Sequence, residues 1–214
     1  ASEIAHYYCE LAEEAVRRKD FELADDHVRH ALERCPTSAR AGITAGAVAL
    51  ALGNGERALR LWNEVMTRTP QYTPLVIGRM ADALNAQGQQ QEALALLHQA
   101  LADNGGIDVM EEAINRIANW EGMDAAKASM VTLLASHPSL SAFSTLMTLR
   151  QKENPADEQT KLLSTLLQRH SRRFAKYQCT RCGFLASSFS WHCLGCGAWD
   201  SFPPRRLEDT KPRG

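Results

Sequence analysis

The sequence lacks three features that would each point to a class of protein: a strong net charge, a long apolar run and a recognisable catalytic motif. Its 214 residues carry 24 Lys and Arg against 25 Asp and Glu, so no overall field favours nucleic acid. No apolar run reaches the about 18 residues that cross a bilayer, and no signal peptide is visible. The chain begins in what looks like mid-helix without Met, so we expect that a leading segment has been removed.

Catalytic patterns are equally scarce. There is no Gly-x-Ser-x-Gly, no His-Glu-x-x-His and no paired acid and base. The turn Gly53-Asn54-Gly55 lacks the Gly-Lys-Ser/Thr of a phosphate loop. Asp26, His27 and His30 recur at helical spacing, and Asp26 with His30 at i, i+4 could hold a metal, but no third ligand is near, so we interpret them as a solvated helix face. We therefore expect a protein that is not an enzyme.

Four of the six cysteines do form a pattern. They occur as two Cys-x-x-Cys pairs with ten residues between them, and each pair is followed by a glycine that can take the positive φ such a turn requires. Two facing turns complete a tetrahedral four-sulfur shell with no open position for an activated water. The predicted metal ligands are Cys179, Cys182, Cys193 and Cys196.

Alternatives to a structural metal site remain. Two disulfides or a thioredoxin-like pair are disfavoured, since no βαβ alternation surrounds the cysteines. The neighbouring His192 could replace a sulfur, but four well-spaced thiols make this unnecessary. Geometry suits zinc and a single rubredoxin-type iron equally, and an iron would leave electron transfer open. Cys9 and Cys35 fit reduced thiols of a cytosolic protein.

Charge is distributed unevenly along the chain. Residues 1–168 carry 15 Lys and Arg against 22 Asp and Glu, whereas residues 169–214 carry 9 against 3. The basic end also holds many aromatic residues, which form a small core around the ion or could stack on bases. A nucleic-acid-binding module is therefore the alternative function.

The first two thirds of the chain repeat. Ala24, Ala31 and Pro36 recur as Ala58, Val65 and Pro70, a shift of 34 residues that is typical of tetratricopeptide-like helix pairs. A third copy holds Ala93 and Ala100 at a shift of 35, with Asn104-Gly105-Gly106 in place of the proline, and Ala126 and Pro138 belong to a weaker fourth copy. Turns are expected at Lys19-Asp20, Gly53-Asn54-Gly55, Gly88-Gln89 and Gly122-Met123.

A further helix pair is expected over 140–151 and 156–170. In its second helix, Leu162, Leu163, Leu166 and Leu167 recur at helical spacing and predict a buried face, followed by a basic end at 169–173. The short connector 174–176 favours docking of the metal module onto the repeats. We expect an all-α solenoid over 1–173, the metal module over 174–203 and a flexible tail over 204–214.

Stacked helix pairs form a groove lined by their first helices, where a peptide or protein could bind. The register places the following residues there, although any single one is more simply explained as part of an ordinary solvated face: His6, Glu13, Arg17, Arg40, Asp82, Asn85, Asn115 and Asn119.

The helical repeats are followed by two motifs, Tyr-Gln-Cys-Thr-Arg-Cys-Gly-Phe at residues 177–184 and Trp-His-Cys-x-x-Cys-x-Ala-Trp at residues 191–199. This arrangement resembles the lipopolysaccharide assembly protein B (LapB) family. The resemblance covers the whole chain, and the motifs that are specific to this family lie in residues 177–199. The second knuckle, Cys-Leu-Gly-Cys-Gly, lacks the proline of many rubredoxin-like knuckles. The ending Cys-x-x-Cys-Gly-Ala-Trp is also similar to the zinc ribbon of the RadA recombinase family, but no phosphate-loop ATPase follows it here.

The LapB resemblance implies a non-enzymatic adaptor at the cytoplasmic face of the inner membrane, held by an N-terminal helix that this sequence does not include. It implies one iron bound by the four cysteines, with zinc as the alternative occupant. It also implies that the adaptor promotes proteolysis of the deacetylase LpxC by the protease FtsH and gathers other lipopolysaccharide assembly proteins. No small-molecule substrate and no nucleic acid are expected as partners, and a homodimer is left open.

Overall fold

The computed structural model describes residues 2–103, 105–171 and 176–210. Ten long helices follow one another in the described chain, and a short 3-10 helix lies between the fourth and fifth. They are α1 (Ser2–Arg17), α2 (Phe21–Arg34), α3 (Ala39–Ala51), α4 (Gly55–Arg68), η1 (Pro70–Leu75), α5 (Ile77–Ala86), α6 (Gln90–Ala102), α7 (Ile107–Trp120), α8 (Met123–Ser136), α9 (Leu140–Glu153) and α10 (Glu158–Ser171).

Local chemistry starts or ends several of the helices. The side chains of Asp20, Ser38 and Asn54 accept a backbone N–H in the first turn of α2, α3 and α4, which is the usual N-cap contact. The predicted turns at Gly88 and Gly122 are confirmed, because both glycines have positive φ, at +79° and +107°. The helices are therefore short and separated by tight turns, as stacked pairs require.

The repeat alanines lie where the two helices of a pair cross. Ala24, Ala58, Ala93 and Ala126 are all fully buried, which confirms the predicted repeat. Small side chains at these positions allow close approach of the backbones, and the apolar faces of neighbouring pairs then bury one another. In most pairs the second helix packs most closely on the first, as α2 does on α1 and α4 on α3, whereas α8 packs about equally on α7 and α9.

One large side chain fills the space between α3 and α4. Trp62 is 1% exposed, and its indole N–H donates to the carbonyl of Ile43 at 3.1 Å. A Cβ at Gly46 would collide with this indole ring. The apolar helix α3 is therefore a repeat helix with neighbours on both sides. None of the described helices combines the length and the apolar character needed to cross a bilayer.

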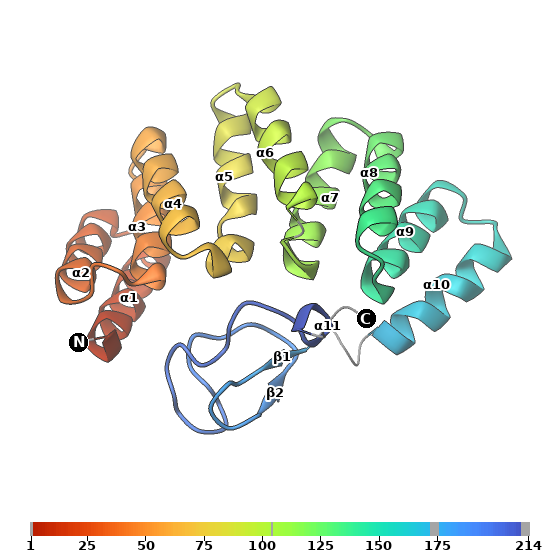
Figure 1. The fold of residues 1–214 in the computed structure, drawn as a ribbon. Coiled ribbons are helices and arrows are strands. Elements are labelled where there is room, and N and C mark those ends of the chain that lie inside the picture. Colours follow the sequence, from red (N-terminus) through yellow and green to blue (C-terminus); the bar gives the residue numbers. More distant parts are fainter. Residues whose placement is uncertain (1, 104, 172–175, 211–214) are drawn as a thin grey trace.

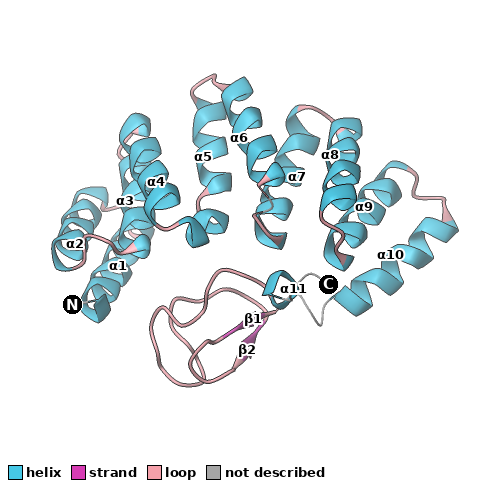
Figure 2. Cartoon of the chain, viewed as in Figure 1, coloured by secondary structure: helices cyan, strands magenta, loops and turns pink. Residues whose placement is uncertain are grey.

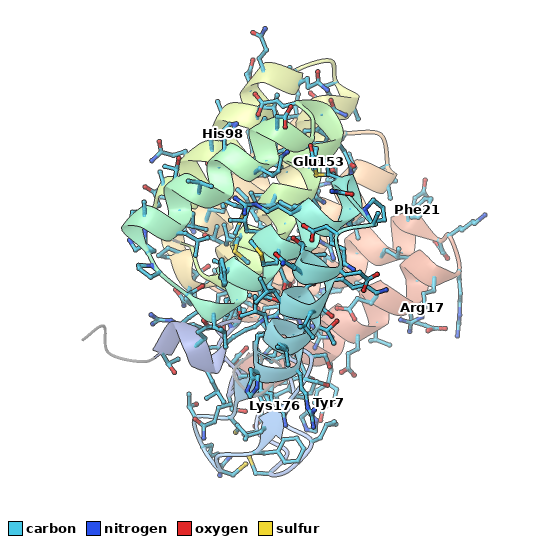
Figure 3. All side chains as sticks on the ribbon, turned by 90° about the vertical axis from the view of Figure 1, so that its right-hand side faces the viewer. Tyr7, Arg17, Phe21, His98, Glu153 and Lys176 are labelled. Atoms are coloured by element: carbon cyan, nitrogen blue, oxygen red, sulfur yellow. The ribbon has the colours of Figure 1, made fainter. Side chains whose placement is uncertain are left out.

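The helices form a curved array, and the C-terminal module lies within its concave side (Figure 1). The module is almost entirely loop, with a single two-stranded ribbon in which β1 (Tyr177–Gln178) pairs antiparallel with β2 (Leu185–Ala186) (Figure 2). A short helix, α11 (Leu207–Thr210), follows it. Viewed from the α10 end, Tyr7 and Lys176 lie at the lower edge of the repeats, where the module begins (Figure 3).

The leucine face predicted for α10 is wrong. Leu162, Leu163 and Leu166 are 61%, 46% and 46% exposed, and only Leu167 is partly buried against the core of the preceding pairs. Helical spacing shows that these leucines share a face, but it does not supply an element to cover that face. In the described part of the chain, α10 is the last helix of the array and has a neighbour on one side only.

The free tail predicted over 204–214 is also wrong for the residues that the structure describes. Pro204 is buried, and residues 206–209 are hydrogen-bonded to the repeats and to the module. The rest of that tail, 211–214, lies outside the described residues, as do 172–175, which hold most of the predicted connector and the end of the basic stretch. The boundary at 173/174 therefore stays a prediction.

Candidate metal centre and its docking surface

The two Cys-x-x-Cys turns have the same backbone geometry. In the first, the N–H of Gly183 donates to the carbonyl of Cys179, and in the second the N–H of Gly197 donates to that of Cys193, both at 2.9 Å. The two glycines have φ of +77° and +70°, a left-handed conformation that side chains rarely adopt. The glycine after each pair is thus required by the turn that brings two sulfurs together.

The two turns face each other and bring four sulfurs into one cluster. All four Sγ atoms lie within 4.8 Å of one another. Cys179 and Cys196 are 3.9 Å apart, and Cys182 and Cys193 are 3.7 Å apart. A tetrahedral ion with metal–sulfur bonds of ~2.3 Å has sulfur–sulfur edges of about 3.8 Å. The cluster therefore fits one four-coordinate ion, and the alternative of two disulfides is wrong because all four thiols are free.

The surroundings of Cys179 favour the thiolate, the form that binds metals, whereas at Cys182 the backbone N–H of Phe184 lowers the pKa but burial and hydrogen bonds with the other three sulfurs raise it to about 12. Burial acts to raise the pKa of Cys179, yet hydrogen bonds from neighbouring groups, among them the backbone N–H groups of Arg181 and Cys182, lower it to about 6. In the second turn the N–H of Gly195 donates to the sulfur of Cys193 at 3.3 Å. Both turns thus direct backbone dipoles at the cluster.

Little apolar material supports the cluster. The buried residues of the module are few, and they include Tyr177, Cys179, Cys193 and Phe202. A core of this size cannot offset the conformational entropy lost on folding, so the segment depends on the ion and on its contact with the repeats.

The first contact with the repeats is made by Trp199. Its indole ring stacks on the imidazole of His6 with centroids 4.5 Å apart and planes 11° apart, and the guanidinium of Arg40 lies 5.6 Å from its centroid. The next residue, Asp200, binds His6 Nε2 at 2.8 Å. Since His6 is 1% exposed, this contact closes the groove over α1 and α3.

The second contact lies at the middle of the array. Trp191 stacks on Tyr72 of η1, with centroids 5.2 Å apart, and meets Phe189 of the module edge to face. Burial, and next to it the charge of Asp200, raise the pKa of Tyr72. The phenol therefore stays neutral and serves as a flat apolar surface at physiological pH.

The third contact is an ionic network at α7. The hydroxyl of Tyr177 donates to Asp108 at 2.7 Å, and burial together with that acceptor raises the pKa of Tyr177 well above its usual range. Arg206 donates to Asp108 at 2.7 Å and to Glu111 at 2.8 Å. Only 16% of the Arg206 side chain and 14% of the Asp108 side chain are exposed, so each charge depends on the other.

The last contact uses two carboxylates of α11. Glu208 accepts the N–H of Leu140 at 2.6 Å and that of Ser141 at 3.2 Å, and Asp209 accepts the N–H of Ile107 at 3.2 Å. These N–H groups begin α9 and α7, where a helix leaves its first donors unpaired and carries a partial positive charge. The sequence reasoning missed both carboxylates. The only signal was an acidic pair inside an otherwise basic end of the chain.

The predicted groove residues fall into three groups. Three of them lie at the covered end, where His6 and Arg40 contact Trp199 and Glu13 accepts from Arg40 at 3.1 Å. Asn115 lines a cleft beside α9. The remaining predicted residues do not contact the module: Arg17 and Asp82 form ion pairs with Glu14 and Arg116, and no side-chain hydrogen bond is described for Asn85 or Asn119.

Two weaker ligand candidates are not part of the cluster. His192 packs against Trp199 at 4.8 Å, and the cluster within the described residues consists of the four cysteines alone. His30 contacts Glu33, and Asp26 contacts Arg29, so this region is an ordinary charged helix face.

The geometry does not favour the nucleic-acid alternative. Trp191 and Trp199 stack on side chains of the repeats, and Phe202 is 1% exposed, so these rings are not free to stack on bases. The guanidinium of Arg206 is held by two carboxylates.

Comparisons with known proteins found matches both for the C-terminal module and for the chain as a whole. Residues 177–204 match a family model described as "Rubredoxin metal binding domain". Lipopolysaccharide assembly protein B of Escherichia coli (strain K12) is 28% identical over 207 residues, which cover 95% of this chain and 53% of that protein. The protein of the same name from Haemophilus influenzae is 24% identical over 94% of this chain and 52% of its own length. The chain thus spans about half the length of these relatives.

A solved structure extends the likeness of the repeats to the fold. The pilF structure from Pseudomonas aeruginosa shares 20% identity, covers 77% of this chain and 76% of its own, and has a TM-score of 0.50. At this identity the likeness concerns the fold alone.

Fold and site together define a tetratricopeptide-like helical repeat protein that carries a C-terminal rubredoxin-type module with a four-cysteine metal site. Within that class, the chain is a homologue of lipopolysaccharide assembly protein B.

Proposed function

We propose that this chain is a non-enzymatic adaptor in the regulation of lipopolysaccharide biosynthesis. The observation that carries the proposal is the docking of a closed four-sulfur module into the concave side of a helical array. Four sulfurs around one ion leave no position for substrate or activated water, and we propose that the centre is structural. Such a protein acts by binding its partners and catalyses no reaction.

Cys179, Cys182, Cys193 and Cys196 are the proposed ligands, and a single rubredoxin-type iron is the proposed ion, with zinc as the other occupant that the geometry accepts. Elemental analysis of protein purified without added metal tests this. One iron per chain and a red oxidised form support the proposal, one zinc in a colourless protein contradicts the choice of iron, and less than about half an equivalent of any metal contradicts the ligand set.

The proposed cellular role is promotion of LpxC proteolysis by FtsH, together with gathering of other lipopolysaccharide assembly proteins, at the cytoplasmic face of the inner membrane. Homology to lipopolysaccharide assembly protein B supports it. In this role the repeats hold the client and the module holds the array in the shape that the client recognises.

The half-life of LpxC after translation is stopped tests this role. In cells whose own copy is replaced by the full-length protein carrying Cys179→Ser, we expect LpxC to persist several-fold longer than with the unchanged protein. Cys35→Ser is the matched control, because Cys35 is a free thiol outside the cluster. Normal LpxC turnover with an ion-free Cys179→Ser protein would contradict the role of the module.

A further inference from the structure

Helix α10 has an apolar face that no described element covers. Leu162, Leu163 and Leu166 are 61%, 46% and 46% exposed, and helical spacing puts them on one side of the helix. We refer to these three leucines as the α10 face. The residues of α10 that are buried are two serines, Ser164 and Ser171. Each of the other nine long helices of the described chain buries at least three apolar side chains. Most of the leucines of α10 therefore lie outside the core.

The α10 face is open to a partner. Figure 1 shows α10 at the end of the array opposite to the N-terminus, and Figure 3, viewed from that end, shows it in front of the other helices. Its packing neighbour is α9. The three leucines are exposed while the C-terminal module is docked, so a partner can reach them without displacing the module.

The two ends of α10 carry opposite charge. Glu158 lies in the first turn, whereas Arg169 and His170 lie in the last turn. Glu158 and Arg169 are 11 residues apart, which is about three turns, so they lie on nearly the same side of the helix. When two such helices lie antiparallel, the acidic start of each faces the basic end of the other. A parallel pair would bring like charges together.

The leucines are arranged about the same centre as the charges. Leu162 and Leu166 lie two residues before and two after Ser164, and Glu158 and His170 lie six residues before and six after it. A two-fold axis level with Ser164 therefore places leucine against leucine and acid against base in one arrangement. An interface between identical subunits has this self-complementary form, and a surface for an unrelated protein has no reason to be symmetric about its own centre.

We propose that the α10 face binds a second copy of this chain, with the two α10 helices antiparallel about a two-fold axis level with Ser164. The leucines of the two copies cover each other, and Glu158 of each copy pairs with Arg169 of the other. A helix of 14 residues is about 21 Å long, so one such pair buries less than the about 1,200 Å² from which standard interfaces begin. The dimer is therefore weak and forms at micromolar concentrations of chain.

Sedimentation velocity of the complete 214-residue, metal-loaded protein tests the proposal. For an interface of this size we expect a monomer near about 1 µM and a dimer near about 200 µM. Leu166→Glu should raise the dissociation constant of the dimer at least tenfold, because it places a charge against the leucines of the other copy. A protein that stays monomeric at the higher concentration overturns the proposal, as does dimerisation that Leu166→Glu leaves unchanged.

Val131→Glu on α8 is the matched control. Val131 is 50% exposed, close to the 46% of Leu166, and its substitution should leave the dissociation constant unchanged. Because Leu166 is exposed in the single chain, Leu166→Glu should keep the helical circular dichroism and the metal content of the monomer. A lost dimer would then not reflect unfolding. Equal weakening by the two substitutions would show that the association is unspecific and would overturn the α10 face as its site.

Exchange of charges tests the antiparallel direction. Glu158→Arg and Arg169→Glu should each raise the dissociation constant about threefold, since each breaks two symmetric ion pairs on the surface. Mixed in equal amounts, the two variants should form a heterodimer within about twofold of the unchanged dimer in stability, because every introduced charge then faces an opposite one. A mixture that associates as weakly as either variant alone would overturn the antiparallel pairing.

Discussion

In the helical array, the repeat alanines Ala24, Ala58, Ala93 and Ala126 are fully buried, and large residues such as Trp62 fill the space between helices. In the C-terminal module, a handful of buried residues surround four sulfurs. The array thus derives its stability from apolar area, whereas the module derives it from an ion and from contacts with its neighbour. We therefore expect the two regions to unfold under different conditions.

Loss of the ion should have the largest effect, and only on the module. In Cys193→Ser or after chelation, folding free energy on the order of 10 kcal/mol is lost from a segment with little other support. We expect residues 177–206 to unfold and the fluorescence of Trp191 and Trp199 to shift, while far-UV circular dichroism keeps the helical signal of α1 to α10. A loss of helix in proportion to the loss of metal would show that the two regions form one cooperative unit.

A cavity in the array should instead destabilise the helices and leave the module unaffected. Trp62→Ala removes a buried indole and its hydrogen bond to Ile43, so we expect a loss of about 3–5 kcal/mol in the free energy of unfolding. Denaturant titration followed by circular dichroism measures it, and Trp120→Ala, at a half-buried ring, should cost less. The metal content should remain unchanged in both variants. Equal losses for the two tryptophans would contradict the packing described here.

Breaking the interface should leave both regions folded but separate them. Arg206→Ala removes the partner of Asp108 and leaves a poorly solvated carboxylate, at a cost of about 3 kcal/mol to docking. Amide hydrogen exchange should accelerate at the starts of α7 and α9, where Asp209 and Glu208 bind. Arg60→Ala on α4 is the control, since Arg60 lies on the exposed surface. Unchanged exchange at Ile107 and Leu140 would show that Arg206 does not hold the module in place.

Protonation of one carboxylate at the start of α10 should have the smallest effect. Hydrogen bonds from the side chain and backbone of Thr160 lower the pKa of Asp157 below its ordinary 3.8. Because the folded pKa is the lower one, Asp157 stabilises the start of α10 above about pH 4, and this is lost as pH falls through the folded value. Asp157→Asn should abolish that dependence. Hydrogen exchange in the first turn of α10 between pH 5 and pH 3 measures it, and an equal response in both proteins would contradict the assignment.

Several features could be predicted because they depend on neighbours in the chain. The turns at Gly88 and Gly122 and the knuckle glycines Gly183 and Gly197 follow from a local need for positive φ. The period of 34 residues follows from alanines that must be small wherever two helices cross. Other features required knowledge of distant contacts. Nothing near Leu162 in sequence reveals that no helix covers it, and nothing near Glu208 reveals that Leu140 offers unpaired N–H groups.

The amino-acid sequence by itself determined the helical repeat, its turns and the pairing of four cysteines into two knuckles, because spacing and backbone conformation are local properties. Only the tertiary structure decided that the module lies inside the groove and that the acidic pair of the tail caps two helices. These outcomes depend on which surfaces meet across as many as about 200 residues of chain, as between His6 and Asp200. Such contacts are selected by the shape and charge of both partners together, and neither partner carries that information alone.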